Sequence, residues 1–243
     1  MAHTQTYFDL LDRFGRPGCP ICGLLLRDEH RAIESLLYEY VSDEGVHEAF
    51  RHGRGLCNHH SWRLAHQYGY SLGVSQLFES ALDEVINLLK QDSETPPNSA
   101  LESALSGWFG GRHDAPLADK LEPESPCLIC ARQREAECRY SQTFATYWHE
   151  DAVQMAYPRC DGLCLPHLRD VLRQMSRPGD RRQLAGIHCA RWTALKGELD
   201  QFQIKSAFNY AGEPMGPEAD SWRRAVASLA GSEGRVGSST RQR

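Results

Sequence analysis

The stretch that decides the fold is Cys19-Pro20-Ile21-Cys22, together with Gly55-Leu56-Cys57-Asn58-His59-His60 further along the chain. A second copy of this pattern follows as Cys127-Leu128-Ile129-Cys130 and Gly162-Leu163-Cys164-Leu165-Pro166-His167. The gap from Cys22 to Cys57 is 35 residues, and the gap from Cys130 to Cys164 is 34. Each half of the chain therefore reads C-x-x-C, a spacer, and then G-L-C-x-x-H.

The likeness of the two halves extends beyond their cysteines and histidines. Residues 40–46 align with residues 147–153 at a constant offset of 107, and Phe50 and Gly55 fall on Tyr157 and Gly162 in the same register. The C-x-x-C motifs are offset by 108, so one residue was inserted or lost in a spacer. We interpret this pattern as an internal duplication.

Both spacers have the apolar periodicity of helices. The stripe of the first spacer consists of Leu26, His30, Ile33, Leu37 and Tyr40, and that of the second of Tyr140, Phe144, Tyr147 and Trp148. Short helices should follow, carrying Val46 and Phe50 in one half and Val153 and Tyr157 in the other, with Ser42 or Asp43 as a cap.

A longer helix is expected in each half after the G-L-C-x-x-H motif. The first should run from Ser71 to about Lys90 with a broad buried face, which consists of Val74, Leu77, Phe78, Ala81, Leu82, Val85, Ile86 and Leu89. The second should start near Asp180 and bury Leu184, Ile187, His188, Trp192, Leu195, Leu199 and Phe202. No stretch alternates as a strand would. We therefore predict an all-α fold of two pseudo-repeated helical metal-binding units packed together.

Composition places the domain boundaries. The predicted first repeat spans residues 1–90, a linker rich in Pro, Ser, Gly and Glu spans 91–126, the second repeat spans 127–208, and a partly disordered tail spans 209–243. Trp108 and Phe109 suggest that the linker packs on something. A short amphipathic segment with Trp222, Val226 and Leu229 is expected within the tail.

Charge and hydropathy restrict the partners and the compartment. The net charge of −5 argues against nucleic acid as the main partner. No run of about 18 apolar residues could span a membrane, and no secretory signal is recognisable, so a cytoplasmic protein is expected. In a reducing compartment nine regularly spaced cysteines indicate metal or redox chemistry, not disulfides.

The spacing within the motifs suits metal coordination. A C-x-x-C turn presents two thiolates on one side of a loop, and residues three apart in C-x-x-H share one face of a helical turn. The eight candidate ligands are Cys19, Cys22, Cys57, His60, Cys127, Cys130, Cys164 and His167. They form two Cys₃His sets, which would bind two zinc ions or, as the alternative, one or two iron–sulfur clusters. Spacing does not decide whether each site forms within one repeat or between the two.

Other readings of the cysteines are weaker. A thioredoxin-like dithiol needs a βαβ context that this chain lacks, and haem attachment needs C-x-x-C-H. Cys138 and Cys189 are expected to be small buried apolar residues, while Cys160 could be an extra ligand or a reactive thiol. Three acidic residues near the repeat corners could accept hydrogen bonds from ligand histidines, although a solvated face is the simpler expectation: Glu44, Glu150 and Asp151.

At these residues the chain resembles an uncharacterised prokaryotic family that is catalogued as a domain of unknown function. The family pattern is a C-P-x-C motif, a helix ending in a Leu-Leu-Tyr-Glu-like segment, G-[LF]-C-x-x-H-x-W, and then a second C-P-x-C and G-L-C-x-P-H-L. Here these are residues 19–22, 36–39, 55–62, 127–130 and 162–168, and Leu128 replaces the usual proline. The resemblance supports the metal sites and implies no activity.

Three functions follow from these observations as hypotheses. The first is a zinc-stabilised helical interaction module that binds a protein partner or a small molecule. The second is an iron–sulfur protein for electron transfer, redox sensing or cluster-based catalysis. The third is a metalloenzyme with an open coordination site. No catalytic pair is recognisable in the sequence, so whether the protein is an enzyme stays open.

Overall fold

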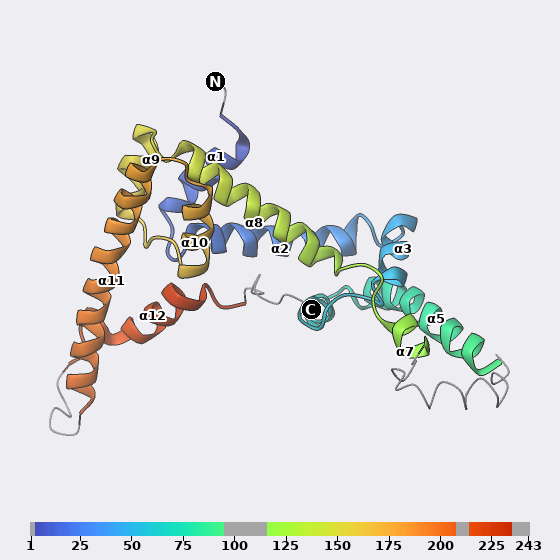
Figure 1. Cartoon of the computed structure of the whole chain (residues 1–243). Coiled ribbons are helices and arrows are strands. Elements are labelled where there is room, and N and C mark those ends of the chain that lie inside the picture. The colour runs from blue at the N-terminus through green and yellow to red at the C-terminus, as the bar shows by residue number, and fades with distance from the viewer. Residues whose placement is uncertain (1–2, 95–115, 208–213, 235–243) are drawn as a thin grey trace, which may run out of the picture. The chain divides into compact units, whose positions relative to one another are not determined.

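The computed structural model describes residues 3–94, 116–207 and 214–234, and within these ranges the chain forms helices and no strand (Figure 1). The predicted all-α class is thereby confirmed. The α-helices are α1 Gln5–Phe14, α2 Pro20–Tyr38, α3 Glu44–His52, α4 Asn58–Ala65, α5 Ser71–Glu94, α7 Pro116–Leu121, α8 Leu128–Tyr147, α9 Asp151–Ala156, α10 Leu165–Gln174, α11 Pro178–Ser206 and α12 Ser221–Ala230. None of these helices combines the length and the apolar character needed to cross a membrane.

Internal contacts divide the chain into two compact units. Unit 1 consists of Met1–Asp28 and Gln133–Arg243, and unit 2 of Glu29–Arg132. The division falls within α2 and α8, so each of these helices contributes residues to both units. It therefore does not coincide with the boundaries at residues 90 and 127 that composition predicts. Most of the predicted linker, with Trp108 and Phe109, lies outside the described residues.

Unit 1 is built around aromatic side chains from α1, α8 and the turn after α9. Phe144, Trp148 and Tyr157 are buried and stack edge-to-face or in parallel on one another. Phe14 of α1 adds edge-to-face contacts with Phe144 and Tyr157. Such pairs contribute about 0.5–1.5 kcal/mol each beyond the area that they bury. The predicted stripe of the second spacer is thus buried at Tyr140, Phe144 and Trp148, and Tyr147 is half-buried.

Unit 2 has a smaller aliphatic core between the C-terminal half of α2 and the helices that follow it. Ile33, Leu36, Phe50, Leu64 and Leu77 are fully buried there. The start of α3 is fixed by Asp43, the predicted cap, whose Oδ1 accepts the backbone N–H of Val46 at 2.9 Å. Val46 and Phe50 of α3 and Leu64 of α4 pack in one core with the C-terminal half of α2.

The buried face of α2 differs from the predicted stripe. His30 and Tyr40 are exposed, whereas Glu29 is fully buried. Ile33 and Leu37 of the predicted stripe are buried, but so are Leu25 and Leu36, so the buried face is only partly the predicted one. Glu29 lies on the inner face because it contacts the polar side chains of α4.

Helix α5 buries less than predicted. Leu77 and Ala81 are buried, but Leu82, Ile86 and Leu89 are exposed, so the expected broad face was wrong. The physical reason is length, because the 24 residues of α5 span about 36 Å, whereas its partners are short: α3 has nine residues, α4 eight and α7 six. The turns of α5 beyond α3 have less to pack against among the described residues.

A buried polar network joins α11 to the loop that precedes Cys164. The Tyr157 hydroxyl donates to Nε2 of His188 at 2.7 Å and accepts the backbone N–H of Leu163 at 3.1 Å. Arg191 Nη2 donates to the Tyr157 carbonyl oxygen at 2.7 Å. Burial, with the nearby Arg191 charge as a second cause, lowers the pKa of His188 to about 4. His188 is therefore neutral in the folded protein at pH 7.

We expect this neutral histidine to make folding sensitive to acid. Below the ordinary pKa of 6.5 the unfolded chain protonates His188 and the folded chain does not, so stability falls as the pH drops from 6.5 towards 4. Because the side chain in His188→Gln cannot titrate, the stability of this variant should fall less steeply as the pH drops. The difference in slope between the two proteins should reach up to about 1.4 kcal/mol per pH unit. Urea unfolding of both proteins at pH 7.5, 6.5, 5.5 and 4.5 measures the difference. Parallel profiles below pH 6.5 would contradict the expectation.

Candidate metal centres

Each C-x-x-C motif lies at the N-terminus of a long helix. Cys19 directly precedes α2 and Cys22 lies in its first turn, while Cys127 and Cys130 have the same places relative to α8. Pro20 suits the first position of a helix, because its φ is already helical and no hydrogen-bond donor is required there. The thiols of both motifs therefore lie where the partial positive charge of a helix N-terminus favours thiolate.

Each G-L-C-x-x-H motif forms a sharp entry into a shorter helix. Gly55 and Gly162 have φ of 90° and 89°, a left-handed conformation that favours glycine. At Gly162 a Cβ would approach Arg191 Nη1 to 2.7 Å, so a side chain there would require the Arg191 guanidinium to move. The cysteine two residues later caps α4 or α10, and the histidine follows in the first helical turn. Thiol and imidazole thus project from the same helix end.

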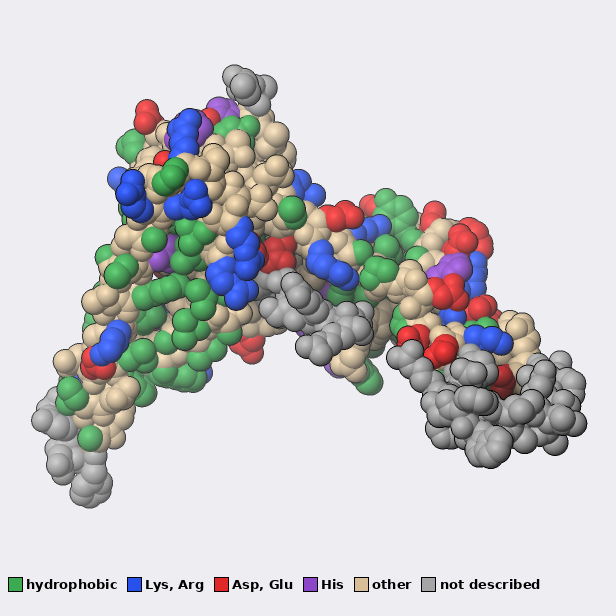
Figure 2. Space-filling model, viewed as in Figure 1, with side chains coloured by type: hydrophobic (Ala, Val, Ile, Leu, Met, Phe, Trp, Pro, Cys, Tyr) green, Lys and Arg blue, Asp and Glu red, His purple; other side chains and the backbone are tan. Residues whose placement is uncertain are grey.

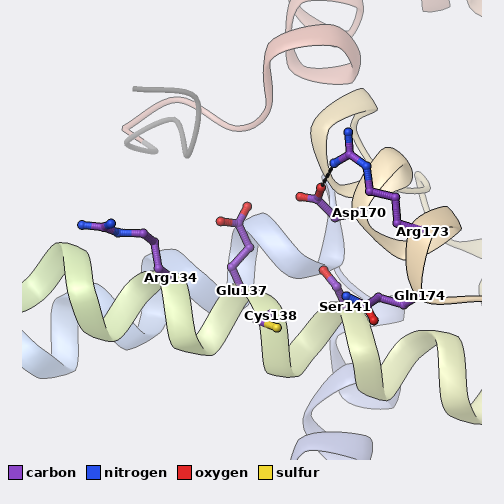
Figure 3. A pocket seen from close by; sticks show the side chains of 7 residues that line it. All are labelled: Arg134, Glu137, Cys138, Ser141, Asp170, Arg173 and Gln174. Carbon is purple, nitrogen blue, oxygen red and sulfur yellow. Dashed lines mark hydrogen bonds and ion pairs between the residues drawn. The ribbon is translucent and has the colours of Figure 1, made fainter. Parts of the chain in front are cut away.

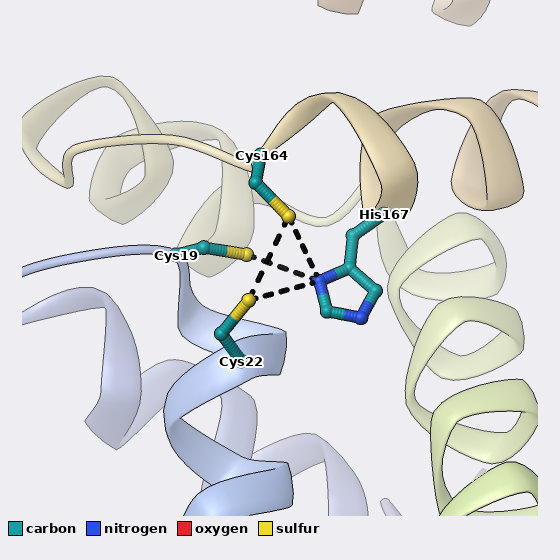
Figure 4. A group of neighbouring side chains, drawn as sticks. All are labelled: Cys19, Cys22, Cys164 and His167. Atoms are coloured by element: carbon teal, nitrogen blue, oxygen red, sulfur yellow. Dashed lines mark hydrogen bonds between the residues drawn. The ribbon is translucent and has the colours of Figure 1, made fainter. Parts of the chain in front are cut away.

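The first group of donors joins the starts of α2 and α10 and is named the α2–α10 site (Figure 4). It consists of Cys19, Cys22, Cys164 and His167, all buried. Nδ1 of His167 lies 3.3 Å from Cys19 Sγ, 3.4 Å from Cys22 Sγ and 3.2 Å from Cys164 Sγ. The Sγ atoms of Cys22 and Cys164 are 3.6 Å apart. Four donor atoms therefore surround one small space.

The second group joins the starts of α4 and α8 and is named the α8–α4 site. It consists of Cys57, His60, Cys127 and Cys130. Nδ1 of His60 lies 3.2 Å from Cys57 Sγ, 3.5 Å from Cys127 Sγ and 3.3 Å from Cys130 Sγ. The Cys57 and Cys130 Sγ atoms are 3.6 Å apart. The geometry repeats that of the α2–α10 site, but the three thiols are half-buried here.

Both groups combine motifs from different halves of the sequence. Cys19 and Cys22 meet Cys164 and His167, and they do not meet Cys57 and His60. Helix length explains the exchange, because α2 has 19 residues and a length of about 28 Å, and α3 and α4 follow its C-terminal end. The structure thus groups each C-x-x-C motif with the G-L-C-x-x-H motif from the other half of the sequence.

In each site at least one thiol has a lowered pKa and at least one other has a raised pKa. Hydrogen bonds with Cys164 and Cys19, and then with His167, lower the pKa of the Cys22 thiol, while burial raises that of Cys19. Burial opposes ionisation of Cys127, but hydrogen bonds with His60 and with backbone groups lower its pKa to about 6. A donor set of three sulfurs and one imidazole nitrogen suits zinc, which binds both types in tetrahedral sites.

The remaining cysteines lie outside both groups. Cys160 is buried, and its Sγ accepts the backbone N–H of Gly162 at 3.3 Å. It supports the left-handed turn and is not an additional member of the donor set. Cys138 and Cys189 are exposed, so the expectation that they are buried was wrong. Both are accessible on helices that bury only a narrow stripe, Cys138 on α8 and Cys189 on α11.

The acidic residues at the repeat corners have other partners. Glu44 pairs with Arg51 at 2.8 Å, and Glu150 pairs with His3 at 2.9 Å. Asp151 is exposed. The carboxylates closest to the ligand histidines are Glu29 and Glu137 instead, which the sequence reasoning missed. A signal was present, since each lies seven residues after the second cysteine of a C-x-x-C motif.

Glu29, His59 and His60 form a third group of donors within 4.8 Å of one another. This group shares His60 with the α8–α4 site. Its carboxylate also accepts a hydrogen bond from Arg63 Nε at 3.0 Å. Because the positively charged guanidinium of Arg63 already pairs with this carboxylate and would repel a cation, we do not count the group as a third metal centre.

A pocket of about 270 Å³ lies between α8 and α10 (Figure 3). Its lining consists of Arg134, Glu137, Cys138, Ser141, Asp170, Arg173 and Gln174. Two arginines and two carboxylates lie in this lining, so it has no strong excess of either charge. Asp170 and Arg173 pair with each other at 2.8 Å. Glu137 is shared between the pocket wall and the surroundings of His167. The pocket thus adjoins the α2–α10 site on the far side of the imidazole ring.

Comparisons with known proteins place the chain in a family without assigning a function. No curated protein and no solved structure gives a significant match. A family model described as a family of unknown function matches residues 6–235, nearly the whole chain. The chain therefore belongs to the family of unknown function DUF6062.

Proposed function

We propose that the protein binds two zinc ions in structural Cys₃His sites and that these ions stabilise a helical module that binds a protein partner. The observation that carries the proposal is the convergence of eight donor atoms into two groups of four, each within 4.8 Å. Two helix N-termini meet at each group, and their partial positive charges offset the net negative charge of a zinc ion with three thiolates.

The distances favour a single ion in each site. Around tetrahedral zinc, with bonds of about 2.3 Å to sulfur and 2.0 Å to nitrogen, neighbouring donors are about 3.5–3.8 Å apart. The sulfur–nitrogen distances of 3.2–3.5 Å and the sulfur–sulfur distances of 3.6 Å lie close to these values. An iron–sulfur cluster interposes several iron and sulfide atoms between its thiolates and needs a wider spacing. This spacing is the reason to prefer zinc.

The closed donor sets favour a structural role over catalysis. Structural zinc has four protein ligands, whereas catalytic zinc retains a position for water or substrate. Both groups supply four donors, and those of the α2–α10 site are all buried. The half-buried thiols of the α8–α4 site make its ion the more accessible of the two, without removing a donor.

Exposed apolar side chains support a protein as the partner. Leu82, Ile86 and Leu89 form an exposed stripe on α5, spaced to lie on one helical face. Hydrophobic side chains also gather over α11 and α12 (Figure 2), where Trp222 and Val226 are exposed. Exposed apolar groups of this kind are typical of binding surfaces. The net charge of −5 makes a nucleic acid the less favoured partner.

Metal analysis of the protein purified without oxygen tests the identity of the ion. We expect about two zinc ions per chain, one for each group of donors, and a colourless solution. Replacement of zinc by Co²⁺ should give the intense visible bands of tetrahedral cobalt with thiolate ligands. Brown protein containing iron and acid-labile sulfide would contradict the zinc assignment.

The exchange of motifs between halves can be tested by paired substitutions. Cys57→Ser with Cys130→Ser affects one site and should remove about one zinc ion, whereas Cys57→Ser with Cys22→Ser affects both sites and should remove two. Sites within single repeats would give the opposite result. Zinc per chain, measured after gel filtration, distinguishes the two arrangements. Cys138→Ser with Cys189→Ser is the matched control and should remove none, because both thiols lie outside the donor groups.

A further inference from the structure

Helices α2 and α8 each carry a sheltered glutamate at the same distance from their C-x-x-C motif. Glu29 follows Cys22 by seven residues, and Glu137 follows Cys130 by seven. Glu29 is fully buried, and the Glu137 side chain is only 12% exposed. A carboxylate in such a position loses most of its hydration, which is unfavourable unless other polar groups compensate. The polar groups near each of these two glutamates therefore indicate what the carboxylate does.

Glu137 lies directly behind the imidazole of the α2–α10 site. Its Oε1 is 2.9 Å from Nε2 of His167, and the histidine is fully buried. The opposite ring nitrogen, Nδ1, faces the three sulfurs at 3.2–3.4 Å. When Nδ1 binds a metal, the ring proton resides on Nε2 and requires an acceptor. Glu137 is the carboxylate within reach of that proton.

Glu29 has the corresponding place behind the imidazole of the α8–α4 site. Its Oε1 lies 3.9 Å from Nε2 of His60, while Nδ1 of His60 faces the sulfurs. The same oxygen accepts a hydrogen bond from Arg63 Nε at 3.0 Å and lies 3.4 Å from His59 Nε2. The Arg63 contact holds this carboxylate near the ring. A small shift of the His60 ring would bring its Nε2 into hydrogen-bond range.

The two contacts are reciprocal. Helix α2 supplies Cys22 to the α2–α10 site and Glu29 to the histidine of the α8–α4 site. Helix α8 supplies Cys130 to the α8–α4 site and Glu137 to the histidine of the α2–α10 site. The same sequence spacing occurs in both helices, and each helix places its carboxylate near the histidine of the site that does not contain its own cysteines. This repetition argues for a common function of both carboxylates.

We infer that Glu137 and Glu29 are positioning residues that accept the Nε2–H of His167 and His60 when Nδ1 of each histidine binds its metal. The inference rests on the proposed zinc function. A carboxylate in this position fixes the tautomer and the orientation of the ring and strengthens the nitrogen as a donor to the metal. Each C-x-x-C-x₆-E segment thus serves both sites, one through its thiols and the other through its carboxylate.

Zinc release from the full chain tests the inference. The zinc-loaded protein is mixed with excess chromogenic chelator, and the release of each ion is followed as a separate kinetic phase. Because loss of such a carboxylate weakens metal binding by about 10- to 100-fold, Glu137→Gln should accelerate one phase by that factor. Glu29→Gln should accelerate the other phase. Glu137→Asp, which keeps the charge but shortens the reach, should release zinc at an intermediate rate.

Glu135→Gln is the matched control, since it removes the same charge from an exposed position of the same helix. Its release rates should stay within about two-fold of those of the unaltered protein. Equal rates for Glu137→Gln and Glu135→Gln would overturn the inference. So would acceleration of both phases together by Glu137→Gln, because that result indicates general loosening of the fold.

Nitrogen-15 spectra of the histidine rings give a readout that loosening alone would not produce. In the zinc-loaded protein the Nε2 proton of His167 should be slow to exchange and shifted downfield, and Glu137→Gln should abolish that shift. An unchanged Nε2 proton would overturn the role of Glu137. Absence of zinc from the unaltered protein would instead refute the proposed function, so the two failures are distinguishable.

Discussion

The structure depends on two helix N-termini being held together at each group of four sulfur and nitrogen donors. Three thiolates within 4.8 Å of one another repel strongly when no positive charge lies between them. The partial positive ends of the helices relieve part of this repulsion, and a divalent cation would relieve the rest. The left-handed glycines and the proline at the start of α2 permit the backbone conformations that bring the donors to these helix ends.

The two sites have the same donors but different surroundings. The α2–α10 site adjoins an aromatic core, and the Tyr157–His188 network fixes the loop before Cys164. The α8–α4 site adjoins a smaller aliphatic core, and its thiols are half-buried. Thiolates that reach solvent react and exchange more readily than buried ones. One site is therefore suited to be inert, while the other is the place where solvent, oxidants or competing metals would act first.

Sequence was sufficient for the helical class and for naming the eight cysteine and histidine residues that the structure groups together, because thiol chemistry and helical periodicity are local properties. Asp43 as a cap and Phe144 and Trp148 as core residues were predictable for the same reason. The pairing of Cys22 with Cys164 was not predictable from spacing, because it depends on where α3 and α4 turn back along α2. The burial of Glu29 and the exposure of Leu82, Cys138 and Cys189 depend on which neighbour each helix face meets. Periodicity identifies the apolar face of a helix, but it does not show how much of that face a neighbouring element covers.

The exchange of motifs between halves has a consequence for the order in which the chain assembles. Cys57 and Cys130 are 73 residues apart and lie entirely within the segment between Cys22 and Cys164, which are 142 apart. The two loops are nested, so closing the inner one roughly halves the free length of the outer one and lowers its closure entropy. During synthesis the inner site can form once Cys130 has emerged, whereas Cys19 and Cys22 wait for His167. Cys19 and Cys22, the first cysteines to be made, therefore remain without their partners for longer than Cys57 does.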